Sequence, residues 1–234
     1  MSNKISVLDN VGFVRLIDSM GDDLSIVRNA RVSYNAAWRA GENKNSDSKL
    51  INFLMKNRHN TPFESVTFTF EVKAPIFVLR QWHRHRTQSY NEISARYKEL
   101  PNEFYIPKQE YIGNQSKDNK QVRDLTTNKN SEQIQNIIAR NNRQAFERYN
   151  ELLNLNTPKE LARTVLPVTI YSHMFATANL HNWFGFLRER LHPHAQYEIN
   201  EYAQVIFLLI RNVCPTASNA FLKTLPEFYV IKYK

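Results

Sequence analysis

The stretch "ESVTFTFEVK", residues 64–73, carries the clearest secondary-structure pattern in the chain. Its apolar side chains alternate with polar ones, so that one face of an extended segment is apolar and the other polar. The apolar members are Val66, Phe68, Phe70 and Val72. This alternation predicts a half-buried strand, which Pro75 ends because proline cannot donate a backbone hydrogen bond to a neighbouring strand.

The segments on either side of this strand predict both helices and further strands. Residues 75–86, "PIFVLRQWHRHR", predict a helix with Pro75 at its first position and charges at its far end. The polar residues 87–92 predict irregular structure. Towards the N-terminus, residues 5–20 predict one or two strands, residues 21–38 a helix, and residues 46–58 a serine-capped helix.

The second half of the chain predicts mainly helices. Residues 131–155 have the period of a long amphipathic helix, and residues 157–167 predict a short helix capped by a threonine. Residues 168–179 predict a strand, followed by helices over 180–190 and 195–215. The polar residues 108–133 predict a mobile loop or insertion without an assigned role. We therefore expect one α+β domain over residues 1–234, with a central, mostly antiparallel sheet flanked by helices.

The composition limits the classes of function. Only 5 of the 234 residues are glycine, and neither GxGxxG nor GxxxxGK[ST] occurs, which argues against a glycine-rich phosphate loop. The formal net charge of +9 favours anionic partners. A single cysteine, Cys214, excludes an internal disulfide and fits a reducing, cytoplasmic compartment. Acidic residues within 1–18 argue against a secretory signal, and no apolar run reaches membrane-spanning length.

Residues 80–97, "RQWHRHRTQSYNEISARY", concentrate positive charge beside an apolar segment. A solvated face is the ordinary interpretation of such a run. A metal site at His83 and His85 is disfavoured because the flanking arginines repel a cation, so no metal is expected. A nucleic-acid-binding protein without catalysis is the alternative function. Small-molecule phosphates bind to the same donors, and Glu71 and Glu92 are too few to neutralise the cluster.

Residues 84–96, "RHRTQSYNEISAR", match the signature Arg-His-Arg-x-x-Ser-x-Asn-Glu-x-Ser-x-Arg at every fixed position. This signature is typical of flavin-dependent thymidylate synthases, and the chain resembles that family over nearly its whole length. The other similar blocks, in the same order as in the family, are "NARVSY" (29–34), "HNTPFE" (59–64), "LARTVLP" (161–167), "TANLHNWFGFLRER" (177–190) and "HAQYEI" (194–199).

The resemblance implies a reaction and a fold. Family members convert dUMP to dTMP with 5,10-methylenetetrahydrofolate as carbon donor and reduced FAD as hydride source, and they release tetrahydrofolate. NADPH re-reduces the flavin. The resemblance also implies the family's α+β fold and a homotetramer whose active sites are shared between subunits, with dUMP and folate as substrates and neither nucleic acid nor membrane as partner.

The resemblance also implies site residues. The residues expected to bind dUMP are Gln81, Arg84, Glu92, Ser94, Ala95, Arg96, Arg163 and Arg190. Those expected to bind FAD are His59, Thr61, Arg84, His85, Arg86, Glu92 and Asn179. Among them, His59 is expected near both flavin and folate, and Arg163 is expected to reach the phosphate from a neighbouring subunit.

Arg190 is expected to be the catalytic residue, because a guanidinium against the uracil ring stabilises the negative charge that develops there. Cys214 is expected to be packed rather than nucleophilic. Two positions depart from the family pattern: Gly185, where many members carry Asn or His, and His181, where an arginine is frequent. Neither residue is assigned to the site.

Overall fold

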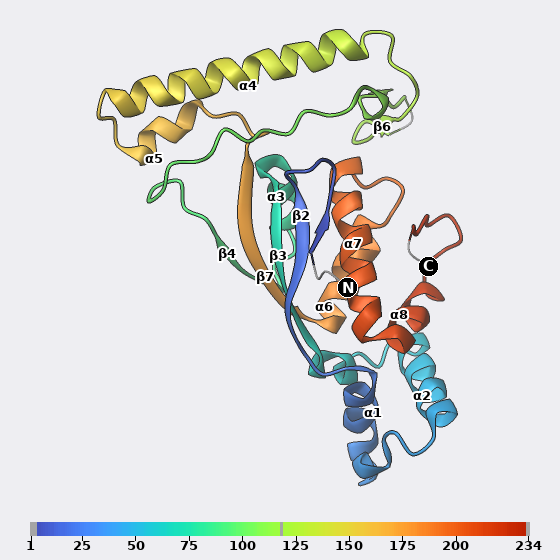
Figure 1. Cartoon of the computed structure of the whole chain (residues 1–234). Coiled ribbons are helices and arrows are strands. Elements are labelled where there is room, and N and C mark those ends of the chain that lie inside the picture. The colour runs from blue at the N-terminus through green and yellow to red at the C-terminus, as the bar shows by residue number, and fades with distance from the viewer. Residues whose placement is uncertain (1–3, 118, 233–234) are drawn as a thin grey trace.

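The computed structural model describes residues 4–117 and 119–232, and an antiparallel sheet forms its centre (Figure 1). The strands lie in the spatial order β1–β2–β3–β7–β4. Their bounds are β1 (Lys4–Ser6), β2 (Phe13–Met20), β3 (Thr67–Pro75), β7 (Tyr171–Asn179) and β4 (Ser89–Glu92). Each pairing between neighbours is antiparallel, so the α+β prediction with an antiparallel sheet is confirmed.

Helices and short turns of helix connect these strands. Their bounds are α1 (Asp23–Val32), η1 (Ala37–Arg39), α2 (Lys44–Lys56), η2 (Thr61–Ser65), α3 (Ile76–Trp82), η3 (Gln109–Tyr111), α4 (Ser131–Asn154), α5 (Lys159–Ala162), η4 (Arg163–Val165), α6 (Leu180–Arg190), α7 (Tyr197–Val213) and α8 (Pro215–Leu222). Among the described residues, none of these helices combines the length and apolar character needed to cross a bilayer.

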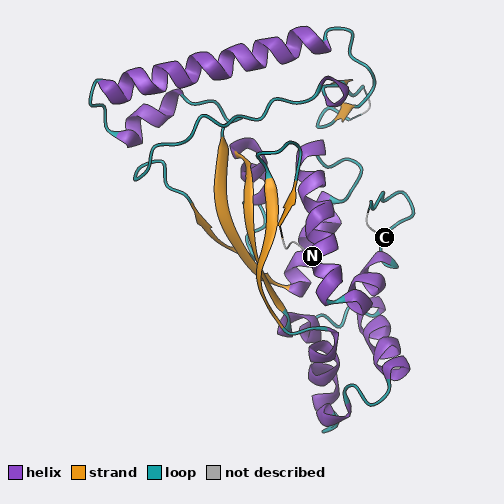
Figure 2. Cartoon of the chain, viewed as in Figure 1, coloured by secondary structure: helices purple, strands orange, loops and turns teal. Residues whose placement is uncertain are grey.

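The apolar face of β3 forms the floor of the core. Val66, just before β3, and Phe68, Phe70 and Val72 within it are fully buried, as the sequence predicts. Helices α3, α6 and α7 cover this face of the sheet (Figure 2). The nine-residue pairing of β3 with β7 extends from Thr67–Asn179 to Pro75–Tyr171 and aligns the two strands after which α3 and α6 begin.

Aromatic packing joins α3 to α6. The ring of Trp82, at the end of α3, lies 4.6 Å from that of Phe186 and 6.4 Å from that of Trp183, measured between centroids. Trp183 in turn meets Phe70 of the sheet edge-to-face at 4.9 Å. All four side chains are fully buried. This packing fixes the C-terminal ends of α3 and α6 relative to each other.

The long helix α4 and the short α5 form an arm across one end of the sheet (Figure 1). Polar contacts hold the arm: the Leu100 amide donates to the Tyr149 hydroxyl at 3.3 Å, and Thr169 donates to the Asn142 side chain at 2.7 Å. Large apolar side chains of the arm and of the chain after it remain exposed: Ile137, Leu155, Leu161, Val165 and Val168.

Several local predictions were wrong, each for a physical reason. Residues 89–92 form β4 rather than irregular structure, because the exposed edge of β7 supplies backbone partners that require no apolar alternation. The helix predicted over 75–86 ends at Trp82, and that over 21–38 ends at Val32. The caps also differ: Asn43 rather than a serine caps α2, and no side chain caps α5.

The polar segment 108–133 contains regular structure, although residue 118 lies outside the described residues. It forms η3, the short hairpin of β5 (Asn114–Gln115) and β6 (Arg123–Asp124), and the first residues of α4. The hairpin lies beyond the N-terminal end of α7 (Figure 1). Its strands are two residues long and polar, so the alternation that marks longer strands is absent from the sequence.

A carboxylate from the start of α1 caps the N-terminus of α8. Asp23 accepts hydrogen bonds from the Thr216 amide at 2.7 Å and the Ala217 amide at 2.9 Å. We expect Asp23→Ala to lower the free energy of unfolding by about 1–2 kcal/mol, since two helix amides lose their partner. Urea denaturation at matched protein concentration measures this. Glu227→Ala, at an exposed site, is the control; equal stability of the two variants would contradict the proposed cap.

Candidate functional site

The turn between α3 and β4 carries the cationic signature residues. Its backbone is held from β4: the Tyr90 hydroxyl donates to the carbonyl oxygens of His85, at 2.8 Å, and Trp82, at 3.2 Å. The Trp82 indole N–H donates to the side chain of Gln88, which is buried within the same turn. The His85 ring is thereby placed edge-on to Phe186, 4.8 Å between centroids.

His85 and Arg190 form the central contact of this region. Arg190 Nε donates to His85 Nε2 at 2.9 Å. Because a guanidinium has no acceptor, His85 Nε2 must offer its lone pair, and the neutral ring carries its proton on Nδ1. Burial, and secondly the charge of Arg190, lowers the pKa of His85 from 6.5 to about 4. His85 is therefore neutral at physiological pH.

Arg190, the last residue of α6, is held from three sides. Besides its bond to His85, its Nη2 donates to the Gln81 carbonyl oxygen at 3.3 Å. The Asn200 side chain of α7 donates to the Arg190 carbonyl oxygen at 2.9 Å. Burial lowers the pKa of Arg190, opposed by Glu189, but the guanidinium stays charged at neutral pH. The result is a half-buried, oriented cation whose side chain forms no ion pair among the described residues.

Arg84 and Arg86 are exposed, and within residues 4–117 and 119–232 no carboxylate pairs with either. Glu71, which the sequence offered as a counterion, is buried and bound by Arg15 and His173. The deficit of negative charge is thus larger than the sequence suggested. Unpaired guanidiniums are donors suited to phosphate, so this turn offers two cationic donor groups to an anionic ligand.

A second group of expected residues lies at the far end of β4. Glu92, Ala95 and Arg163 line a cavity of about 110 Å³, together with Ser172 of β7. The Ser172 hydroxyl donates to the Glu92 carboxylate. Arg163 therefore shares a cavity with Glu92 and Ala95 of its own chain. The prediction that it acts from a neighbouring subunit remains untested.

Ser94 and Arg96 belong to the same turn. Ser94 Oγ accepts from the Arg96 amide at 3.3 Å, which shapes the backbone after β4. The Arg96 guanidinium lies 3.6 Å from the exposed carboxylate of Glu160 on α5. His83 links this group to the α3 turn, since its Nε2 lies 3.9 Å from Glu92 Oε2.

A third group lies where η2 meets the start of α6. His59 and Thr61 are exposed, and His59 packs edge-on to Phe53 at 5.7 Å. Asn179 caps α6 by accepting from the Asn182 amide at 2.9 Å. The Leu180 amide donates to the Val66 carbonyl, which connects η2 to α6. No hydrogen bond within the described part of the chain joins these residues to Arg190.

The surroundings of Gly185 and Cys214 indicate whether either residue has a role in the site. Gly185 is exposed on α6, and an added Cβ there would meet nothing within 4 Å, so packing does not require glycine. Cys214 is fully buried, and burial followed by Asp23 raises the pKa of its thiol, which opposes a nucleophilic role. In the described ranges no group of three or more His, Cys, Asp or Glu side chains is placed to hold a metal ion.

A set of polar residues behind Gln81 was not predicted from the sequence. The Gln81 side chain donates to that of Gln196, which donates to the buried carboxylate of Glu198. Arg123, from the β6 strand of the polar segment, pairs with the same carboxylate. Gln196 and Glu198 lie in the "HAQYEI" block, but no local pattern there indicated a contact with Gln81, 115 residues away.

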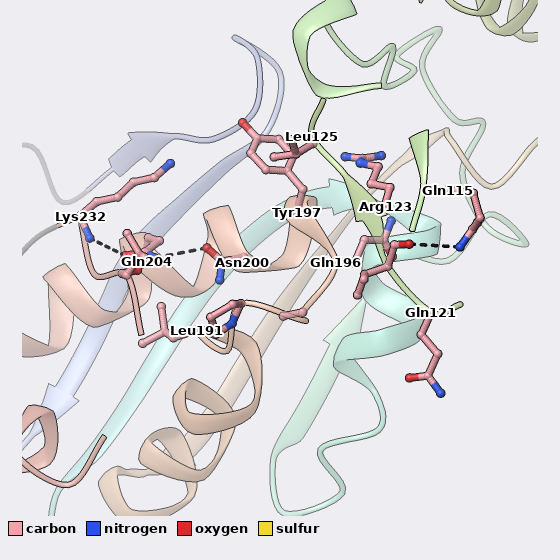
Figure 3. A pocket seen from close by; sticks show the side chains of 14 residues that line it. Gln115, Gln121, Arg123, Leu125, Leu191, Gln196, Tyr197, Asn200, Gln204 and Lys232 are labelled. Carbon is pink, nitrogen blue, oxygen red and sulfur yellow. Dashed lines mark hydrogen bonds between the residues drawn. The ribbon is translucent and has the colours of Figure 1, made fainter. Parts of the chain in front are cut away.

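A cavity with a volume of about 380 Å³ lies beside this set. Figure 3 shows its two walls: the hairpin carrying Gln115 and Arg123, and α7 carrying Asn200 and Gln204. Gln204 donates to Asn200 at 3.2 Å. Asn200 in turn donates to the backbone of Arg190.

Comparison with known proteins identifies close relatives. The sequence model of the family described as "Thymidylate synthase complementing protein" matches residues 15–216. A flavin-dependent thymidylate synthase of Thermotoga neapolitana is 44% identical over 220 residues, covering 94% of each chain. One from Thermus thermophilus is 45% identical over 223 residues, covering 95% of this chain and 80% of the relative.

Solved structures show the same fold. A UMP/dUMP methylase from Streptomyces cacaoi bound with 5-Br dUMP superposes with a TM-score of 0.83 and 35% identity, covering 94% of this chain and 97% of that one. The same methylase bound with 5-Br UMP gives a TM-score of 0.81, covering 93% and 96%.

The low pKa of His85 is directly testable. We expect the imidazole to titrate near pH 4, and Arg190→Met to raise that pKa without restoring 6.5, because burial remains. NMR titration of histidine-labelled protein measures it. Arg188→Met, which removes a cation bonded instead to Thr224, should leave the pKa unchanged. An equal effect of both substitutions would mean that the His85–Arg190 contact is not responsible.

The lowered pKa of His85 also makes the free energy of unfolding depend on pH. The folded pKa lies below the unfolded one, so between pH 4 and 6.5 the unfolded chain binds more protons. The contribution of neutral His85 is therefore fully present above pH 6.5 and is lost as the pH falls towards 4.

Proposed function

The chain belongs to the flavin-dependent thymidylate synthase family, and from this we propose that it catalyses the reductive methylation of dUMP to dTMP. In the proposed reaction 5,10-methylenetetrahydrofolate donates the carbon, FAD carries the hydride, NADPH is the reductant and tetrahydrofolate is released. We further propose a cytoplasmic location, where these small molecules meet. The observation that carries the proposal is Arg190, a half-buried guanidinium oriented by neutral His85 and without an acidic partner among the described residues.

In this proposal Arg190 activates the uracil ring. Carbon 5 of uracil is a weak nucleophile until electron density moves towards it from the ring. A fixed guanidinium beside a ring oxygen and nitrogen stabilises the charge that accumulates there, and it needs no reorganisation during the reaction. Neutral His85 leaves the charge of Arg190 uncancelled and adds no second cation. The buried thiol of Cys214 takes no part.

The phosphates are held by arginines in place of a glycine-rich loop. We propose that Arg84 and Arg86 hold the FAD phosphates, with His59, Thr61, His85, Glu92 and Asn179 as further contacts. For dUMP we propose Gln81, Arg84, Glu92, Ser94, Ala95, Arg96 and Arg163, besides Arg190. The assignment of phosphates to Arg84 and Arg86 is supported by their lack of acidic partners, because their guanidiniums pair with no carboxylate of the described chain.

We also propose that the enzyme is a homotetramer with shared sites. The expected residues form three groups in one chain, around Arg190, around Ala95 and around Asn179. The turn that carries His85 contacts the other two groups, through His83 and Glu92 and through Thr87 and Asn182. A site assembled from several subunits would add residues of a neighbouring chain to these groups. The exposed apolar residues of the α4–α5 arm, including Leu155 and Leu161, offer a surface for such contacts.

UMP is the second candidate substrate, because the solved relative is described as a UMP/dUMP methylase. Thymidylate synthase activity among relatives of 44–45% identity favours dUMP for this chain.

The proposed function is tested with purified protein. Supplied with FAD, NADPH, methylenetetrahydrofolate and either dUMP or UMP, it should form dTMP from dUMP at a higher kcat/KM than 5-methyl-UMP from UMP. Mass spectrometry of the nucleotides measures both products. Protein that retains FAD but forms neither product would refute the proposal.

Arg190→Ala should reduce turnover about a hundred- to a thousandfold, which is typical of losing one preorganised electrostatic contact. Arg190→Lys should restore little, because a point charge lacks the planar two-donor geometry. The rate of dTMP formation at saturating dUMP is measured, with bound FAD quantified separately. Arg188→Ala on the same helix is the matched control and should keep normal turnover; a similar loss in both variants would exclude a specific role for Arg190.

A further inference from the structure

A relay of side-chain hydrogen bonds leads from a buried carboxylate to the proposed nucleotide site. Glu198 is 1% exposed and sits in the first turn of α7. Its Oε1 accepts from Arg123 at 2.7 Å and from the Tyr105 hydroxyl at 3.1 Å. Its Oε2 accepts from Gln196 Nε2 at 2.9 Å. Gln196 Oε1 in turn accepts from Gln81 Nε2.

The chemistry of the carboxylate fixes the direction of every bond in this relay. An ionised carboxylate only accepts hydrogen bonds, so Gln196 must turn its NH₂ group towards Glu198. The carbonyl oxygen of Gln196 then faces Gln81, which must donate a hydrogen bond from its own NH₂ group. What remains at the outer end is Gln81 Oε1, an acceptor, and no residue in the described ranges donates to it.

Arg123 gives the polar hairpin a role in this arrangement. Its guanidinium is the cation that pairs with Glu198, and it also lies 5.6 Å from the Tyr197 ring. The neighbouring Tyr111 stacks on Tyr197 at 4.4 Å. These contacts hold the hairpin segment against the start of α7, at the edge of the 380 Å³ cavity. Without its cation, a buried carboxylate would be costly.

We propose that Glu198 is a positioning residue for the nucleotide site: held by Arg123, it sets the direction of the Gln196–Gln81 relay, so that Gln81 presents its carbonyl oxygen to a hydrogen-bond donor of dUMP. This inference rests on the proposed function. The donor is either the uracil N3–H or the sugar 3′-hydroxyl. A ligand group that could only accept would find no partner in Gln81.

Glu198→Gln tests the proposal because it changes polarity almost without changing shape. Arg123 and Tyr105 both donate to one atom, so the new amide keeps its oxygen there and turns its NH₂ group to Gln196. The relay must then reverse, and Gln81 must present NH₂ outward. We expect Kd for dUMP, measured by calorimetry, to rise roughly ten- to a hundredfold. KM for dUMP should rise with it, while kcat at saturating dUMP changes by less than about threefold.

The matched control is Glu201→Gln, the same change on the same helix. Glu201 pairs with Lys232 and, within the described ranges, makes no hydrogen bond to Gln196 or Gln81. This variant should bind dUMP as the wild type does. Thermal melting of each variant checks folding. If Glu198→Gln does not fold, Gln196→Leu, which interrupts the relay at a partly exposed position, should show the same loss of affinity.

Two dUMP analogues identify the donor. One carries a methyl group on uracil N3, and the other lacks the 3′-hydroxyl. The analogue without the contacted donor should bind the wild type weakly and lose nothing further in Glu198→Gln. Unchanged dUMP affinity in Glu198→Gln, or an equal loss with dUMP and both analogues, would overturn the inference while leaving the proposed function intact. Failure of the wild type and Glu201→Gln to bind dUMP would instead overturn the proposed function and this inference with it.

Discussion

The packing of Trp82 against Trp183 and Phe186 is the contact on which the proposed active site depends. It joins the ends of α3 and α6, which leave neighbouring strands of the sheet and would otherwise carry their last residues independently. With these rings packed together, His85 and Arg190 lie within hydrogen-bond distance. An apolar contact therefore determines the position of a charge, and the surrounding burial keeps His85 neutral beside it.

The sequence predicted those elements whose side chains alternate or repeat with a helical period. The strand at residues 67–75 and the helix at 180–190 follow this rule because each buries an apolar face, and the helix at 131–154 follows it with an apolar stripe that is only partly buried. The strand at 89–92 does not, since its pairing comes from backbone groups of β7. The short hairpin of the polar segment was missed for the same reason.

The site residues could be predicted only in part. The signature residues 84–96 identified the cationic turn and the segment after β4. The resemblance to a family assigns binding roles to residues, whereas periodicity predicts only secondary structure. The contact of Arg190 with His85 spans 105 positions, and that of Arg123 with Glu198 spans 75. Polar contacts between such distant residues leave no local pattern in the sequence. The set of polar residues behind Gln81 therefore became apparent only in the structure.

The arginines at the site illustrate a conflict between stability and binding. Arg84, Arg86 and Arg190 are all cationic, and no carboxylate of the described chain forms an ion pair with their side chains. A nearby carboxylate would stabilise the free protein, but it would compete with a phosphate for the same guanidiniums. In the proposed arrangement Glu198 satisfies both requirements, because it is buried behind Gln81, is paired with Arg123 and would be separated from dUMP by two neutral amides. Through those amides it transmits the direction of its hydrogen bonds without placing a negative charge beside an anionic substrate.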